Sequence, residues 1–225
     1  MEFIPIELNE MPYEKAIKFD ERAYTQYYLS LINYKNIVLF TFFLSNDYNS
    51  RILKIDLFCD MLIIHFAVNT LFFTDSTIHK IYEDKGSYNF IYQIPQILYS
   101  SFISIFLNQI LKRLSLSESN ILELKNTRIN IECKTKNIKQ KFKIKFIFFF
   151  VFSFIILFFL WLYLSCFCVV YKNTQLHLVK DTLISLGISF VTPFFISILP
   201  GIIRISSLKR KNKCLYKFSK IIQLL

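Results

Sequence analysis

The chain has 225 residues, of which 54% are hydrophobic and 18% aromatic, and its mean hydropathy is positive at +0.41. A single soluble domain does not need so much apolar material. The net charge of +11 would suit a nucleic-acid-binding protein, but the lysines lie beside apolar runs rather than among exposed aromatics, so we expect no nucleic acid partner. The five cysteines form no Cys-x-x-Cys pair, and we expect free thiols without a metal or other cofactor.

Residues 1–50 predict an amphipathic segment on the cytosolic surface of a membrane. Between Leu8 and Leu44, acidic and basic residues alternate with Tyr, Ile and Leu, and the segment ends in the apolar run Ile37–Leu44. This run is too short to cross a bilayer, so we expect interfacial helices with Tyr and Lys at headgroup level. A fifth span that begins near Tyr24 is the alternative, and it would move the N-terminus to the outside.

Four segments predict membrane-spanning helices, which makes the expected fold class all-α: a polytopic integral membrane protein with additional interfacial amphipathic helices. The strongest segment is Phe146–Tyr171, which carries no charge and exceeds the roughly 20 apolar residues that a helix needs to cross a bilayer. A buried helix of a soluble protein is the alternative, but core helices rarely stay apolar on every face for so long. The predicted spans are residues 52–73 and 91–111, within 51–113, and residues 146–171 and 182–203, within 146–204.

The first and the last of these spans are interrupted. The first carries Lys54, Asp56 and Asp60 in its early turns, so we expect its charged end at the membrane interface. The last contains residues that should kink or break a helix unless neighbouring helices satisfy the freed carbonyl groups. These residues are Pro193, Pro200 and Gly201.

The distribution of basic residues supports this set of spans and orients it. Residues 1–54 hold six Lys and Arg, residues 112–145 hold ten, and the tail from Arg204 holds seven, which is 23 of the 27 in the chain. The loops at 74–90 and 172–181 hold two each. Because cytosolic loops are enriched in Lys and Arg, we expect both termini in the cytosol.

Two basic segments are candidates for contact with anionic lipid headgroups: the predicted cytosolic loop at 114–145 and the predicted interfacial tail at 205–225. Each Lys or Arg near an anionic surface contributes on the order of 1 kcal/mol to binding. A topology signal without a specific lipid is the alternative. The residues concerned are Lys139, Lys141, Lys143, Lys145, Lys209, Arg210 and Lys211.

Polar side chains within the spans are the remaining candidates for chemistry. The sequence has no glycine-rich phosphate loop, no His-x-x-x-His pair and no nucleophile elbow, so we expect no enzymatic activity. His65 and Asn69 are four residues apart and share a helix face, which Asp60 and Asp56 continue toward the cytosol. Ionisable groups inside a membrane are functional hypotheses by default. Hydrogen bonding to a neighbouring helix is the structural alternative.

A second polar stripe lies on the predicted span at 91–111 and suits packing against other transmembrane helices, in a homo- or hetero-oligomer. Small polar residues at near-helical spacing let two helices approach closely in lipid. The stripe consists of Ser100, Ser101, Ser104 and Asn108. At the mouth of the last span, Lys180 and Asp181 are expected to form an interfacial pair.

Several short motifs follow one another along the chain. They are Asp47–Arg51 with Lys54, Asn69–Phe73, Tyr99–Ser104 with Lys112-Arg113, and Phe159–Tyr171 followed by Asp181–Ser185 and Pro193. Their order resembles the membrane region of the polycystin family over about residues 45–205. A further set of strings resembles the C-terminal membrane region of large uncharacterised protist membrane proteins; these are Tyr171–Gln175, Lys180–Ser185 and Leu199–Ile202.

The polycystin resemblance implies a membrane-anchoring, sensory or channel-associated module. The family's six-span cation pore and its lipoxygenase-homology domain have no counterpart here, so we expect no ion conduction by this chain alone, and no functional residue carries over. We therefore expect a non-catalytic scaffold or subunit of a larger assembly. A small proton-coupled transporter or channel that uses Asp60, His65 and Asn69 and the interrupted last span is the alternative. An enzyme acting on lipids, with the Asp56, Asp60 and His65 face as its site, comes third.

Overall fold

The structure, a computed structural model, describes residues 3–116, 121 and 131–224, except for the side chains of 131–136 and 224. Every regular element in these residues is a helix. The chain forms two compact units. Met1–Tyr48 and Phe190–Leu225 together make up the first, called the terminal unit below, and Asn49–Ser189 make up the second, called the bundle unit.

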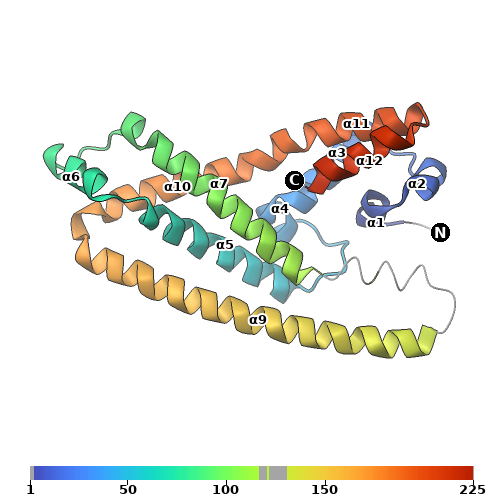
Figure 1. Cartoon of the computed structure of the whole chain (residues 1–225), viewed down its shortest axis with the longest axis horizontal. Coiled ribbons are helices and arrows are strands. Elements are labelled where there is room, and N and C mark those ends of the chain that lie inside the picture. The colour runs from blue at the N-terminus through green and yellow to red at the C-terminus, as the bar shows by residue number, and fades with distance from the viewer. Residues whose placement is uncertain (1–2, 117–120, 122–130, 225) are drawn as a thin grey trace. The chain divides into compact units, whose positions relative to one another are not determined.

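The bundle unit contains α5 (Arg51–Leu71), α6 (Asp75–Glu83), α7 (Phe90–Ser115), α9 (Ile131–Val170), the 3-10 turn η1 (Lys172–Thr174) and most of α10 (Gln175–Ile196). The four long helices alternate in direction along the chain, so that α5 and α9 run one way and α7 and α10 the other (Figure 1). The short helix α6 leaves the end of α5 at an angle of 81°. The unit is therefore an up-down-up-down helical bundle.

The helix α5 is the most enclosed element of the bundle unit. It packs against α7 and α9, and its His65 side chain contacts Ser185 of α10. Two contacts fix its parallel register with α9: Asp60 meets Ser153, and the Phe73 ring just beyond α5 lies 5.7 Å from the Phe167 ring. Most of the polar side chains of α5 are consequently turned toward other helices of the unit.

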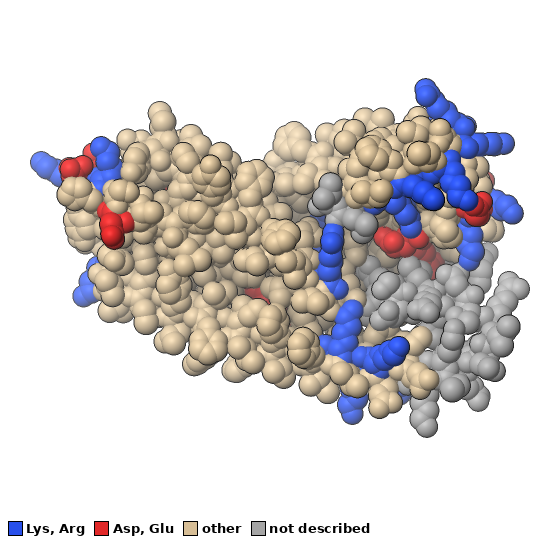
Figure 2. Space-filling model, viewed as in Figure 1, with Lys and Arg blue, Asp and Glu red and all other residues tan. Residues whose placement is uncertain are grey.

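The outer surface of the bundle helices is apolar. Large hydrophobic side chains on α7, α9 and α10 are more than half exposed; examples are Phe102, Phe106, Phe154, Trp161 and Leu183. In Figure 2 the bundle unit presents a broad uncharged surface, with its charged side chains gathered near α6 and near the lysine-rich beginning of α9. Soluble proteins place apolar side chains inside and charges outside, so this surface has the opposite polarity.

Three helical segments are long and apolar enough to cross a membrane: Phe90–Ser115, Asn137–Val170 and Lys172–Lys209. The predicted first span is a helix, but α5 reaches the same criterion only when it is combined with the bent α6. The charged residues in its early turns are the reason. Among the described residues, three helices therefore have the length and composition of a span by themselves, and a fourth has them only as a bent pair.

The helix α9 begins fifteen residues before the predicted span, because the basic segment ahead of Phe146 continues the same helix from Ile131. Residues 131–145 contain neither Gly nor Pro, and lysine is a good helix former. The predicted cytosolic loop at 114–145 is thus partly helical. Its residues 117–120 and 122–130 lie outside those that the structure describes.

The terminal unit contains α1 (Pro5–Glu10), α2 (Tyr13–Phe19), α3 (Tyr24–Lys35), α4 (Ile37–Phe42), the end of α10, α11 (Ile198–Lys209) and α12 (Lys213–Leu224). The predicted amphipathic segment is thus divided into four short helices. Asn36 causes one division, because its side chain accepts hydrogen bonds from the backbone N–H groups of Val38 and Leu39 and caps α4. Pro12 precedes α2 in extended conformation and causes another.

The predicted helix-breaking residues of the last span have unequal effects. The helix α10 continues through Pro193 to Ile196, and the break falls at Ser197, where the backbone N–H still reaches the Pro193 carbonyl at 3.1 Å. Pro200 has no N–H group to offer the Ile196 carbonyl four residues earlier, which explains the position of the break. Gly201 lies beside the Tyr24 ring of α3, where a Cβ atom would be 2.9 Å from Tyr24 Cε2.

Arg204 of α11 lies at the centre of the terminal unit and is fully buried. Its guanidinium group donates to the carbonyl oxygens of Leu8 and Asn9 and to Asp20 Oδ2 at 3.0 Å. The same group lies 4.8 Å from the ring centroids of Tyr27 and Tyr216. This one side chain therefore connects α11 to α1, to α3, to the segment before α3 and to α12.

Asp20 also binds a second guanidinium group, because Arg22 donates to its two oxygens at 2.7 and 3.0 Å. Burial alone would raise the pKa of Asp20, but Arg22 and Arg204 outweigh it and hold that pKa below its ordinary value. Burial raises the pKa of the neighbouring Tyr27 to about 12, so its hydroxyl stays neutral.

The helices α11 and α12 form a hairpin with a well-defined turn. The Lys211 N–H donates to the Leu208 carbonyl and the Asn212 N–H to the Ser207 carbonyl, the pair of bonds that defines a Schellman motif. Lys211 adopts a φ of 52°, a left-handed conformation that glycine usually occupies. Asn212 then caps α12 through its side chain.

Candidate functional site

The candidate site is a column of buried polar side chains along α5 in the bundle unit. At its centre His65 is fully buried, and its Nδ1 atom lies 3.0 Å from Ser185 Oγ of α10. The Ser101 hydroxyl of α7 lies 2.9 Å from the same Ser185 Oγ. His65, Ser101 and Ser185 therefore join three helices through side-chain contacts.

One turn further along α5, Asn69 forms a second connection. Its Nδ2 group donates to the His65 carbonyl at 2.8 Å, and its Oδ1 atom accepts from the Ser100 hydroxyl at 2.6 Å. Both side chains are fully buried. The adjacent serines of α7 thus contact different helices: Ser100 contacts α5, and Ser101 contacts α10.

Asp60 occupies the opposite end of the column. Its carboxylate is fully buried, and both oxygens lie 3.0 Å from the Ser153 hydroxyl of α9. Asp56, one turn earlier, is half-buried, and its Oδ2 atom is buried without a hydrogen-bond partner among the described residues. Asp60 and Asn69 are separated by nine residues of helix, which corresponds to about 13 Å along the axis.

The expected interfacial pair of Lys180 and Asp181 is not formed between those two residues. Asp181 turns into the bundle, where it accepts from the Tyr88 hydroxyl at 2.6 Å and from Gln96 Nε2 at 3.3 Å. Lys180 instead places its ammonium group 4.9 Å from the centroid of the Tyr88 ring. Burial, followed by the hydrogen bond and charge of Asp181, raises the pKa of Tyr88, so the phenol remains a donor.

Several polar atoms in this column are buried and have no hydrogen-bond partner among the described residues. They are His65 Nε2, Ser104 Oγ, Thr182 Oγ1, and both side-chain polar atoms of Asn108. In the antiparallel register that Asn69 and Ser100 define, Ser104 lies opposite His65, and Asn108 lies one turn nearer Asp60. The interior therefore offers unused donors and acceptors between the buried histidine and the buried carboxylate.

The structure brings together the predicted polar residues of α5 and the predicted polar stripe of α7. The stripe of Ser100, Ser101, Ser104 and Asn108 faces the interior of the bundle unit, where the first two contact α5 and α10. It is therefore used within the chain rather than left open to other helices. The sequence reasoning missed three partners, Ser153, Ser185 and Tyr88. Ser153 left a signal, because it interrupts an otherwise continuous run of large apolar residues.

The predicted lipid-contacting residues remain on the surface. Lys139, Lys141 and Lys143 are exposed on α9, and Lys145 is half-buried with its ammonium group donating to the Leu116 carbonyl. In the terminal unit, the exposed residues at the end of α11 are Lys209, Arg210 and Lys211. Within the described part of the chain, no group of three His, Cys, Asp or Glu side chains could hold a metal ion.

Comparison of the chain with protein-family models, with curated proteins and with solved structures gives no match. The polycystin resemblance therefore rests on its short motifs alone.

Proposed function

We propose that the chain is a four-span integral membrane protein that acts as a non-catalytic scaffold or subunit of a larger membrane assembly. The observation that carries this proposal is the inverted polarity of the bundle unit. Asp60, His65 and Asn69 are fully buried, whereas Phe154 and Trp161 of α9 are more than 60% exposed. A bilayer favours this arrangement, because it dissolves apolar side chains and makes exposed ionisable ones costly.

The same arrangement explains how α5, the least apolar of the proposed spans, could lie in a membrane. The helix α5 would be a poor membrane helix by itself, since charged side chains at a span centre cost about 2.5–3.5 kcal/mol each on insertion scales. Its Asp60 and His65 side chains find partners on α9 and α10 instead of meeting lipid. We therefore count α5 as the first span, with α6 as an outer turn, and retain the topology with both termini in the cytosol.

The surface available to other subunits differs from the sequence-based expectation. The polar stripe of α7 is buried within the bundle unit, so partner helices are expected on the exposed aromatic faces instead. On α7 this face includes Phe102 and Phe106, which are 61% and 65% exposed. Association of such faces in lipid depends on van der Waals packing rather than on a hydrophobic driving force.

Insertion and topology can be tested with single-cysteine variants and a membrane-impermeant maleimide. In a cysteine-free background, Cys214 restored in α12 should react in intact cells only after the membrane is permeabilised, because the maleimide then reaches the cytosolic side. A Ser87→Cys variant in the turn after α6 should react from the opposite side. The protein should also resist alkaline carbonate extraction. Reaction of both cysteines from the same side, or complete extraction, would refute the proposed topology.

The partner side of the proposal requires a separate measurement. Affinity purification of the full chain in mild detergent should recover a stable larger subunit. Less of that subunit should be recovered when Phe102 and Phe106 are replaced by Ala. Replacement of the exposed but separate Leu183 by Ala provides a matched control for lost apolar area. Recovery of a lone chain under all detergent conditions would contradict the scaffold role.

A second candidate function is proton transfer along the polar column. Two buried carboxylates, Asp60 and Asp181, lie on either side of His65 along the bundle, and several polar atoms without a partner among the described residues lie between them. In vesicles that contain the purified chain and a pH-sensitive dye, His65→Ala or Asp60→Asn should abolish proton flux. Ser165→Ala, which changes an exposed hydroxyl of α9, is the control. Flux that is absent in the parent protein, or unchanged in both variants, would exclude this candidate.

A further inference from the structure

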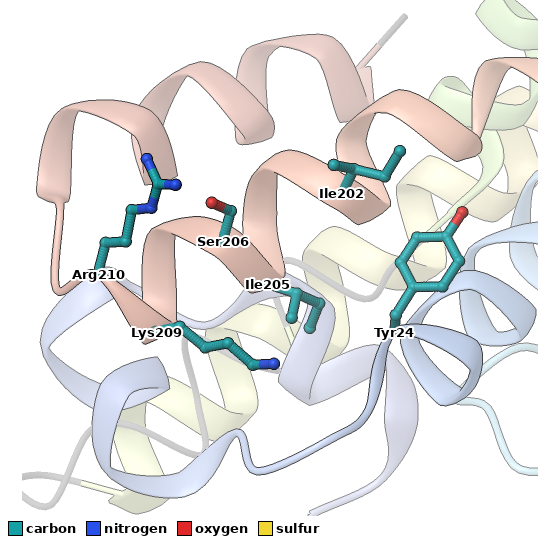
Figure 3. Close-up of a pocket in the computed structure, with 6 residues that line it drawn as sticks. All are labelled: Tyr24, Ile202, Ile205, Ser206, Lys209 and Arg210. Atoms are coloured by element: carbon teal, nitrogen blue, oxygen red, sulfur yellow. The ribbon is translucent and has the colours of Figure 1, made fainter.

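A surface cavity of about 390 Å³ lies in the terminal unit between α3 and the second half of α11. Its lining is shown in Figure 3 and consists of Tyr24, Ile202, Ile205, Ser206, Lys209 and Arg210. The α11 residues other than Arg210 recur at intervals of three and four, so they share one face of the helix. Tyr24 supplies the opposite wall.

Gly201 keeps the Tyr24 wall in place. Because glycine has no Cβ atom, the Tyr24 ring can lie against the α11 backbone, at a position that a Cβ would approach to 2.9 Å. The ring also stacks on Tyr28, with 5.7 Å between the centroids and 13° between the planes. The ring is therefore held between α11 and its own helix, and the apolar side of the cavity has a defined shape.

The cations at the cavity have no acidic partner in the part of the chain that the structure describes. Among those residues, neither Lys209 nor Arg210 forms an ion pair, whereas Arg204 is paired with Asp20. In Figure 3, the Lys209 side chain extends beneath Ile205 in the direction of Tyr24, while Arg210 points away from it. Lys209 is thus the cation placed to bind an anion at the cavity, and Arg210 adds positive potential beside it.

The cavity combines this positive end with apolar surface. Ile202, which is 53% exposed, lies on the side of the cavity away from Lys209, and exposed Leu199 continues the apolar surface along α11. The hydroxyl groups of Tyr24 and Ser206 make no side-chain hydrogen bond among the described residues and remain available as donors. Charge at one end and hydrocarbon at the other are the features of an amphiphile with an anionic headgroup.

We propose that this cavity binds one anionic glycerophospholipid, with its phosphate group at Lys209 and an acyl chain along Ile205 and Ile202. The proposal rests on the membrane location proposed above, because the occupant is a component of the bilayer. It assigns a discrete lipid site to one end of α11 rather than a general attraction of basic residues to a charged surface.

Native mass spectrometry of the full chain in mild detergent tests the site with phosphatidylglycerol and phosphatidylcholine of equal chain length. The parent protein should bind one phosphatidylglycerol in preference to phosphatidylcholine. The double substitution Lys209→Gln and Arg210→Gln should weaken phosphatidylglycerol binding about 25-fold, or about fivefold for each cation removed. Lys217→Gln, which removes an exposed cation of α12 outside the cavity, should change it less than twofold.

A second variant separates cavity shape from charge. Gly201→Ala leaves every charge in place but displaces the Tyr24 ring, so it should weaken phosphatidylglycerol binding. Thermal stability measured in parallel shows whether the variant is still folded. Glycerol phosphate, which has the anionic group without acyl chains, should fail to compete. Competition by glycerol phosphate, equal binding of the two lipids, or a dimer formed through this face would overturn the lipid assignment.

These outcomes also separate the site from the proposed function. An extractable protein that keeps selective lipid binding in detergent would refute membrane insertion but retain the cavity assignment. A protein that inserts as proposed and shows no selectivity, or loses as much affinity with Lys217→Gln as with the double variant, would refute the cavity assignment alone.

Discussion

Replacement of Asp20 by asparagine should open the terminal unit, because this carboxylate is shared by two guanidinium groups. The Asp20 side chain is 1% exposed, the Arg22 side chain 11%, and the Arg204 side chain 0%. In the Asp20→Asn variant, both arginines keep their charge in a buried setting and lose the only carboxylate that the structure gives them among the described residues.

The size of the effect follows from what remains around the arginines. Removal of one partner from a buried ion pair typically costs about 3–5 kcal/mol. Arg204 would keep its hydrogen bonds to Leu8 and Asn9 and its two aromatic neighbours, and Arg22 would keep its bonds to Asn9 and Ser30. We therefore expect the lower end of the range, about 3 kcal/mol, which corresponds to an opening equilibrium about 100-fold more favourable.

Hydrogen exchange of α12 in detergent measures this opening directly, since α12 packs on α11 and Tyr216 is buried there. Its amides should exchange about 100-fold faster in the Asp20→Asn variant, provided that exchange reports the opening equilibrium. Glu14→Gln is the matched control, because Glu14 pairs with Lys213 of α12 but both side chains are more than half exposed. Exposed pairs contribute little, so a large effect of Glu14→Gln, or none of Asp20→Asn, would refute this reasoning.

Three further predictions concern stability. The depressed pKa of Asp20 predicts that its contribution is complete above the unfolded value near 3.9 and is lost as the pH falls through the lower folded value, which a pH series of the same exchange measurement checks. Lys211→Gly should stabilise the α11–α12 hairpin by about 1 kcal/mol in thermal unfolding, because glycine adopts the left-handed conformation without strain; a loss of stability would contradict the turn geometry. Asn69→Leu should destabilise the bundle unit by about 1 kcal/mol through the lost contact with Ser100, and no change would indicate that this hydrogen bond contributes nothing.

The regular elements were predictable wherever one local signal dominated. The apolar run at Phe146–Tyr171 lies in α9 up to Val170, where the helix ends, and the uncharged segment at 91–111 falls within α7. The helix boundaries were less predictable. Charge marks the end of a membrane span and so predicts a loop for the basic residues before Phe146, but lysine does not end a helix, and α9 continues through them. Proline likewise does not always end a helix. The helix α10 continues through Pro193, and the break at Ser197 coincides instead with the N–H group that Pro200 lacks.

The candidate site was predictable in part, because helical spacing relates residues on one helix but not on different helices. The shared side of His65 and Asn69 follows from their interval of four residues, whereas Asp60, five residues before His65, lies on another side of α5 and faces α9 instead. Their partners Ser153 and Ser185 depend on the register between helices that are distant in the chain. The inward turn of Asp181 depends on Tyr88, which lies 93 residues earlier, and no local pattern relates the two.

The enclosed position of α5 has a consequence for how such a protein is made. For a chain that inserts as proposed above, α5 leaves the ribosome before the helices that hold the partners of its polar side chains. The Ser100 partner of Asn69 follows after about one further helix, but Ser153 and Ser185 are synthesised last. An insertion machinery that released each helix into lipid as it emerged would expose Asp60 and His65 to hydrocarbon. The least apolar helix of the bundle therefore has to be retained in a protected, hydrated site until the third and fourth helices have been translated.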